Sequence, residues 1–117
     1  MSNLHISSDF SGLDALIPQG RRVFVVIDSN LKPFFGLFER YELIPIQTSA
    51  KVKTFATVEY IIEQLLERGA DRSSFLVGVG GGITTDLCGF AASVYKRGIR
   101  FGFVPTTLLA QVDASIG

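Results

Sequence analysis

The stretch that decides the predicted fold is residues 74–86, S-F-L-V-G-V-G-G-G-I-T-T-D. Its first part, Phe75–Val77, is a short apolar run with a β-branched end, which is typical of a buried strand in a parallel sheet. Four glycines follow within five positions, from Gly78 to Gly82. Beyond them, apolar residues recur at helical spacing, which predicts a helix from about Thr85 to Lys96. The order is therefore strand, glycine turn, helix.

A junction of this kind is suited to nucleotide phosphates. Glycine lets the backbone approach a phosphate closely, and a helix N-terminus presents unpaired N–H groups with a positive partial charge. The match to the G-x-G-x-x-G fingerprint is imperfect, because Ile83 stands where the third glycine is expected. The acidic residue expected after the next strand is also missing. The glycines alone therefore fit a tight turn without a ligand as well.

Two more strands are predicted before the glycine stretch. Val23–Ile27 is a continuous apolar, β-branched run, which indicates a strand buried on both faces. A short amphipathic helix over Leu31–Arg40 follows it, with Pro33 in the first turn. Tyr41–Ile46 is the second strand, and Pro45 within it indicates an edge position or the end of the strand.

The clearest helix starts after Thr54, a suitable N-cap, and Gly69 is a natural stop. Its apolar stripe consists of Phe55, Val58, Ile61, Ile62, Leu65 and Leu66. Arg100–Val104 predicts the last strand and Thr106 to about Ser115 the last helix. Strands and helices thus alternate with short links. This predicts an α/β fold, a three-layer Rossmann-like open parallel sheet with helices on both faces.

Composition excludes several classes of function. Of 117 residues, 47% are hydrophobic and 19% are charged, which indicates one globular domain. Basic and acidic residues number 11 each, so nothing points to nucleic acid or an acidic membrane surface. No apolar run is long enough to span a bilayer, and no secretory signal is recognisable, so we expect a cytoplasmic location. One cysteine and one histidine make no metal site.

Three segments carry a resemblance to a known family. They are G-G-G-I-T-T-D-L-C-G-F-A-A at 80–92, Y-K-R-G at 95–98 and P-T-T-L-L-A-Q-V-D-A-S-I-G at 105–117. Together they resemble 3-dehydroquinate synthase, from about Asp71 to the last residue. Metal-dependent glycerol dehydrogenases share the glycine turn, whereas the last segment is more particular to sugar-phosphate cyclases. Residues 1–70 match in layout more than in letters.

The resemblance implies NAD as cofactor and a set of residues that contact it. Asp28, at the end of a strand, would contact the adenosine half, although as a pattern it equally fits a helix N-cap. Residues 48–53 correspond to the family's second cofactor loop, in which Lys53 is present but Ala50 replaces an expected Glu. Asp86, in the first turn of the predicted helix, either suits the helix dipole or holds a hydroxyl group. The full set is Asp28, Asn30, Leu31, Lys53, Gly81, Gly82, Ile83, Thr84, Thr85, Asp86, Thr106 and Thr107.

Two further residues are implied to be catalytic. Asp113 corresponds to the family's substrate-contacting Asp; by pattern alone it is an exposed helical carboxylate. Arg97, beside Lys96 and Arg100, would reach the substrate phosphate of the neighbouring subunit in a homodimer, which suits the planar fork of donors of arginine. By pattern it is also a favourable charge at a helix C-terminus. Cys88 is expected to be a packing residue.

The family is a lyase that acts on a phosphorus–oxygen bond in the shikimate pathway of aromatic amino acid and chorismate biosynthesis. It converts 3-deoxy-D-arabino-heptulosonate 7-phosphate to 3-dehydroquinate and phosphate, with NAD and a divalent metal, Zn or Co. The resemblance places the metal ligands in a second domain. We therefore expect residues 1–117 to be an N-terminal NAD-binding domain that is inactive by itself. The alternatives are another sugar-phosphate cyclase, a metal-dependent alcohol or glycerol dehydrogenase, or a non-catalytic nucleotide-binding module.

Overall fold

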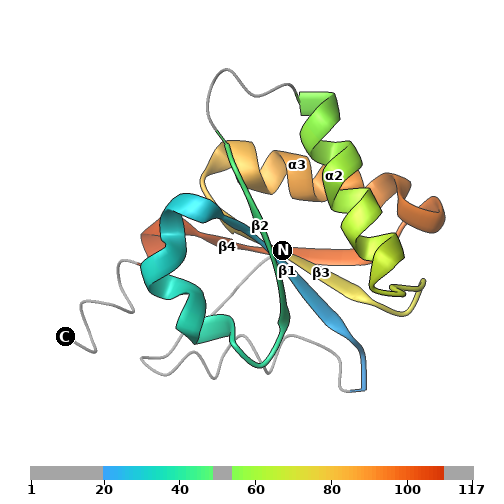
Figure 1. The fold of residues 1–117 in the computed structure, drawn as a ribbon, viewed down its shortest axis with the longest axis horizontal. Helices are drawn as coiled ribbons and strands as arrows, with labels where there is room; N and C mark the ends of the chain where they lie inside the picture. The colour runs from blue at the N-terminus through green and yellow to red at the C-terminus, as the bar shows by residue number, and fades with distance from the viewer. Residues whose placement is uncertain (1–19, 49–53, 110–117) are drawn as a thin grey trace.

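The computed structural model describes residues 20–48 and 54–109, and it is drawn in Figure 1. In this part of the chain, strands alternate with helical segments. The elements are β1 (Val23–Asp28), η1 (Ser29–Phe38), β2 (Glu42–Ile46), α2 (Thr54–Glu67), β3 (Phe75–Gly80), α3 (Gly82–Val94), η2 (Tyr95–Arg97) and β4 (Arg100–Pro105). A further helical turn begins at Thr106. No helix in these two ranges is long and apolar enough to cross a membrane.

The strands form one parallel sheet in the order β2-β1-β3-β4. From β1, the chain runs outward to β2 and then returns past β1 to β3. The chain adds β2 beside β1 in one direction and β4 beside β3 in the other, so the strand order reverses between β1 and β3. In open α/β sheets, ligands bind at such a point, beyond the carboxyl ends of the strands.

Each face of the sheet has its own hydrophobic core. Phe24 and Val26 of β1 pack with Leu76 of β3 beneath α2 and α3, while Val25 and Ile27 lie on the opposite face. η1 covers that second face together with Leu108 and Leu109 of the last helical turn. Figure 1 shows α2 and α3 together on one side of the sheet and η1 on the other. The predicted three-layer α/β sheet with helices on both faces is confirmed.

The alternation of side chains explains why β1 is apolar throughout. Successive residues of a strand point to opposite faces, and both faces of this central strand are covered. All five residues from Val23 to Ile27 are buried. Among the described strands, β2 lies at the edge of the sheet, which is one of the two positions that Pro45 indicated.

The glycine stretch differs from the prediction at both ends. β3 continues through Val79 to Gly80, and α3 begins at Gly82, about three residues before the expected start. Glycine is a poor helix former, so local propensity favours a later start. Packing decides otherwise, because Thr84 and Leu87 in the first turns of α3 are buried against the rest of the fold.

The stripe predicted for α2 is only partly buried. Val58, Ile61 and Leu65 lie in the core, but Phe55 is 80% exposed and Leu66 is 55% exposed. The predicted stripe is wider than the face that α2, a helix of 14 residues, presents to the sheet. Residues at the borders of the stripe therefore remain at the surface. The predicted helix over Leu31–Arg40 is a 3-10 helix that starts at Ser29 and contains non-helical dihedral angles at Leu31.

Candidate functional site at the carboxyl edge of the sheet

Four residues form a row across the carboxyl edge of the sheet. Asp28 of β1 pairs with Ile46 of β2, and Gly80 of β3 pairs with Pro105 of β4. The β1–β3 register, with Ile27 opposite Val79, places Asp28 and Gly80 at the same level. The residues predicted to follow these strands therefore meet at one edge, as the rule for parallel sheets requires.

Asp28 uses both carboxylate oxygens in this structure. The backbone N–H of Asn30 donates to Oδ1 at 2.9 Å, which makes Asp28 the N-cap of η1. The hydroxyl of Thr48 donates to Oδ2 at 2.8 Å. Each carboxylate oxygen has a second lone pair, so both remain able to accept further hydrogen bonds. The capping role and a ligand-binding role are therefore compatible.

The turn between β3 and α3 requires glycine at position 80. Gly80 has φ +153°, and a Cβ atom there would lie 2.7 Å from Thr84 Oγ1. A Cβ at Gly81 or Gly82, in contrast, would meet nothing within 4 Å. Gly81 is the N-cap of α3 and provides no side-chain cap. Within the described ranges, the first N–H groups of α3 thus lack a side-chain cap, and neither Gly81 nor Gly82 has a side chain to cover them, which is the arrangement that accommodates an anion.

The other predicted residues of this turn take different positions. Ile83 is exposed, whereas Thr85 is half-buried. The hydroxyl of Thr85 donates to the carbonyl of Gly82 at 3.1 Å. The side chain of Thr84 is buried beneath Gly80, so only its backbone can face a ligand. Asp86 is exposed. Its predicted place in the first turn of the helix is wrong, because the earlier start of α3 makes it the fifth helical residue.

Thr106 and Thr107 follow β4 and are exposed at the start of the last helical turn. Their position beside Gly80 follows from the pairing of Gly80 with Pro105. Leu108 and Leu109 of this turn pack on the chain's own sheet, and Leu109 is 1% exposed. The carboxyl edge therefore brings Asp28, Asn30, the glycine turn and the two threonines together.

Arg97 is not part of this group. It precedes β4 and therefore lies at the amino edge of the sheet, opposite the carboxyl edge. Lys96 and Arg97 have φ values of 45° and 70°, and the N–H of Gly98 donates to the carbonyl of Tyr95 at 2.7 Å. Two consecutive non-glycine residues in this region are unfavourable, so the tight turn into β4 is held by its surroundings. Lys53 and Asp113 lie outside the described residues.

Among the residues that the structure describes, no three His, Cys, Asp or Glu side chains are grouped as metal ligands. This part of the chain does not fit the divalent metal that the family resemblance implies. Cys88 is buried in the core, and burial raises the pKa of its thiol to about 12. It is a packing residue, as expected.

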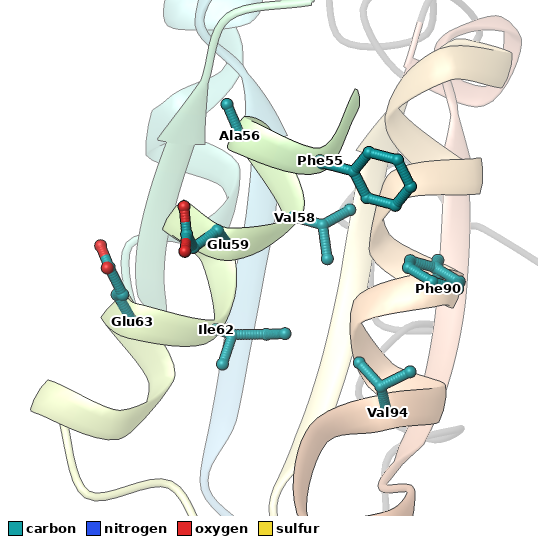
Figure 2. A pocket seen from close by; sticks show the side chains of 8 residues that line it. All are labelled: Phe55, Ala56, Val58, Glu59, Ile62, Glu63, Phe90 and Val94. Carbon is teal, nitrogen blue, oxygen red and sulfur yellow. The ribbon is translucent and has the colours of Figure 1, made fainter. Parts of the chain in front are cut away.

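An apolar hollow lies away from this edge, between α2 and α3. Figure 2 shows Phe55, Val58 and Ile62 of α2 on one side and Phe90 and Val94 of α3 on the other. Glu59 and Glu63 also line it. It offers neither a phosphate-binding turn nor a base paired with a nucleophile, so we assign it no part in the candidate site.

Comparison with known proteins finds relatives of this chain. The sequence model described as 3-dehydroquinate synthase N-terminal matches residues 43–117, more than half of the chain. The chain belongs to the 3-dehydroquinate synthase family. The 3-dehydroquinate synthase of Leptospira interrogans serovar copenhageni is 39% identical over 124 residues, which cover 97% of this chain and 34% of that protein. The chain thus spans about a third of the length of this relative.

Solved structures of sugar-phosphate cyclases share the fold. A 2-deoxy-scyllo-inosose synthase complexed with carbaglucose-6-phosphate, NAD+ and Co2+ matches with a TM-score of 0.69 and 27% identity, over 82% of this chain and 29% of that one. The 2-epi-5-epi-valiolone synthase of Streptomyces hygroscopicus, with NAD+ and Zn2+ bound, matches with a TM-score of 0.66 and 29% identity, over 89% and 31%. This chain therefore corresponds to less than a third of either cyclase.

Sequence reasoning missed one polar contact at this edge. Thr48 lies 20 residues from Asp28, and only the pairing of β1 with β2 brings the two side chains together. The family resemblance marks residues 48–53 as a loop near the cofactor, but it carries no signal for this hydrogen bond. The register of two strands would have been needed to predict it.

Proposed function

We propose that this chain is the NAD-binding part of a 3-dehydroquinate synthase, the lyase that converts 3-deoxy-D-arabino-heptulosonate 7-phosphate to 3-dehydroquinate and phosphate. The observation that carries the proposal is the meeting of Asp28, Gly81, Gly82 and Thr106 at one edge, beside the point where the strand order reverses. Membership of the family and the NAD+ bound in the two cyclase structures support NAD as the ligand.

Each group at this edge has a chemical role in the proposal. The uncapped N–H groups at the start of α3 would bind the pyrophosphate, because they combine free donors with the positive end of the helix. Asp28 would accept hydrogen bonds from the ribose hydroxyls, and Thr106 and Thr107 would offer hydroxyl donors from the next strand. Bound NAD would supply the hydride acceptor for the carbon that is oxidised and later reduced again.

The proposal also includes the expectation that this chain alone does not catalyse the reaction. No metal cluster occurs in the described residues, and the chain spans about a third of its curated relatives. We therefore expect residues 1–117 to release no phosphate from the heptulosonate phosphate. Arg97 of one copy would serve the substrate of a second copy in a homodimer, since it lies at the edge opposite its own chain's site. Measurable phosphate release by the purified chain would contradict the expected inactivity.

Calorimetry with NAD tests the central claim. We expect binding that is weak but measurable, and we expect Asp28→Ala to weaken it about tenfold to a hundredfold, because a hydrogen bond to a charged group contributes about 1.5–3 kcal/mol. The matched control is Glu67→Gln, which removes a carboxylate at the far end of α2. Equal affinity of Asp28→Ala and the parent, or an equal loss in both variants, would contradict the proposed site.

A second candidate is a different sugar-phosphate cyclase, because the two solved cyclases share this fold at TM-scores of 0.69 and 0.66. The NAD site would be the same in either case. The complete protein decides between them, since the first candidate releases phosphate from the heptulosonate phosphate and the second turns over a different sugar phosphate. Binding of NAD by this chain does not distinguish the two.

A further inference from the structure

We propose that Thr48 is a positioning residue, which holds the carboxylate of Asp28 in the orientation that binds a ribose. This inference rests on the proposed NAD site and adds a residue to it. Thr48 is not assigned to touch the cofactor. Its effect would pass through the hydrogen bond from its hydroxyl to Asp28 Oδ2.

The contact connects the ends of two neighbouring strands. Asp28 ends β1 and lies opposite Ile46, the last residue of β2. Thr48 follows two residues later, half-buried, and its side chain reaches back to Asp28 at 2.8 Å. Because β1 is a central strand with a neighbour on each side, its end is a rigid base for this contact.

The two hydrogen bonds of Asp28 have different consequences. The N–H of Asn30 donates to Oδ1 and fixes one oxygen at the start of η1. This single bond tolerates a range of angles, so the side chain of Asp28 keeps some freedom about both of its torsions, the last of which has a broad energy profile. The hydroxyl of Thr48 fixes Oδ2 from the other side. The carboxylate is thus ordered before a ligand arrives, and binding loses less side-chain entropy.

Acceptor capacity remains after both bonds. An ionised carboxylate has about four lone-pair sites, and these two contacts occupy two of them. A pair of ribose hydroxyls requires two acceptor sites with a defined separation. An ordered carboxylate offers them without further rearrangement, which is the reason that a residue acting through Asp28 would change cofactor affinity.

The test compares Thr48→Val and Thr48→Ser by calorimetry with NAD, each in the parent chain and in the Asp28→Ala background. Valine keeps the shape but removes the donor, and serine keeps the donor. We expect valine to weaken NAD binding about threefold to tenfold, less than the loss of Asp28 itself because Thr48 acts only through the orientation of that carboxylate, and serine to stay within about twofold. In the Asp28→Ala background, we expect Thr48→Val to cause no further loss of NAD affinity, because the carboxylate through which Thr48 acts is already absent.

Three results would overturn the inference. They are unchanged affinity in Thr48→Val while Asp28→Ala weakens binding, an equal loss in the valine and serine variants, and an undiminished valine effect in the Asp28→Ala background. A parent chain that binds no NAD would refute the proposed function instead. In that case, three-bond couplings of Asp28 in solution, which report the torsion about its Cα–Cβ bond, still decide whether Thr48 orders the side chain. A single rotamer in the parent that averages in Thr48→Val supports ordering, and unchanged couplings contradict it.

Discussion

Gly80 lies directly against the side chain of Thr84, so that a Cβ atom at position 80 would stand 2.7 Å from Thr84 Oγ1 and 2.8 Å from its Cβ. The φ of +153° at Gly80 is also unfavourable for any other residue. The strand can therefore turn into α3 only at a glycine, and Thr84 fills the space that this glycine leaves. The phosphate-binding geometry of the turn depends on this packing.

We predict that Gly80→Ala lowers the free energy of unfolding by about 2–4 kcal/mol, through the strained dihedral angle and the clash with Thr84. Gly81→Ala is the matched control, because a Cβ there meets open space, and its effect should stay within about 1 kcal/mol. Urea unfolding of the three proteins measures both changes. Equal stability of the two variants would show that the turn can rearrange.

Gly81→Asp should separate stability from ligand binding. An aspartate at the N-cap of α3 accepts hydrogen bonds from the first N–H groups and interacts well with the helix dipole, so we expect unchanged stability or a gain of up to about 1 kcal/mol. The same carboxylate would occupy the donors and repel a pyrophosphate, which should weaken NAD binding more than tenfold. Gly36→Asp, at an exposed position of η1, is the control for the added charge. NAD affinity that survives in Gly81→Asp would exclude the start of α3 as the pyrophosphate site.

Tyr95→Phe should destabilise the chain by about 1–2 kcal/mol. The buried hydroxyl of Tyr95 donates to the carbonyl of Ala70 at 2.7 Å, and the substitution would leave that acceptor without this donor. Burial, followed by the nearby charge of Asp71, raises the pKa of this hydroxyl, so it remains a donor at neutral pH. Tyr60→Phe, at a hydroxyl on a side chain that is 42% exposed, is the control and should change stability by less than about 0.5 kcal/mol. Equal denaturation midpoints for the two variants would refute the prediction.

Cys88 should be inert in the folded chain and should make stability fall at alkaline pH. Burial raises the pKa of its thiol from 9.0 to about 12, so the folded state keeps the proton that the unfolded state loses above pH 9. The contribution is complete below pH 9 and is lost as the pH rises toward 12, at up to about 1.4 kcal/mol per pH unit. The stability difference between the parent and Cys88→Ala should therefore shrink above pH 9. Because the chain has one cysteine, rapid thiol labelling of the native chain would directly contradict its burial.

Glu42→Gln should cost less than about 1 kcal/mol, although Arg22 donates to Glu42 Oε2 from two nitrogens, at 3.0 Å and 2.6 Å. Both side chains are well exposed, at 48% and 38%, so water competes with the pair. Arg22 also lies 4.8 Å over the ring of Phe24 and keeps this contact in the variant. The cost should decrease further with added salt. A loss above about 2 kcal/mol that does not respond to salt would show that this pair is a main stabilising contact.

The structure changes how several predicted residues act at the site. The sequence pattern at Asp28 fits both a helix cap and a cofactor contact. The structure shows the cap together with a second hydrogen bond, from Thr48. Thr84 was predicted at the cofactor, yet its side chain is buried under Gly80. Asp86 was placed in the first helical turn, and the earlier start of α3 moves it beyond that turn. Each difference comes from packing between segments, which local sequence patterns do not specify.

The sequence by itself determined the order of strands and helices and the burial of β1 on both faces, because these follow from side-chain alternation and apolar periodicity. For β2, Pro45 indicated an edge position or the end of the strand, and β2 lies at the edge of the four described strands. It also determined the family, through residues 80–117. Only the tertiary structure decided which polar groups meet. The register of β1 with β2 brings Thr48 to Asp28, and the close approach of α3 to β3 places Thr84 beneath Gly80. Such contacts join segments that are far apart in the chain, and these segments come close together only when the whole sheet has assembled.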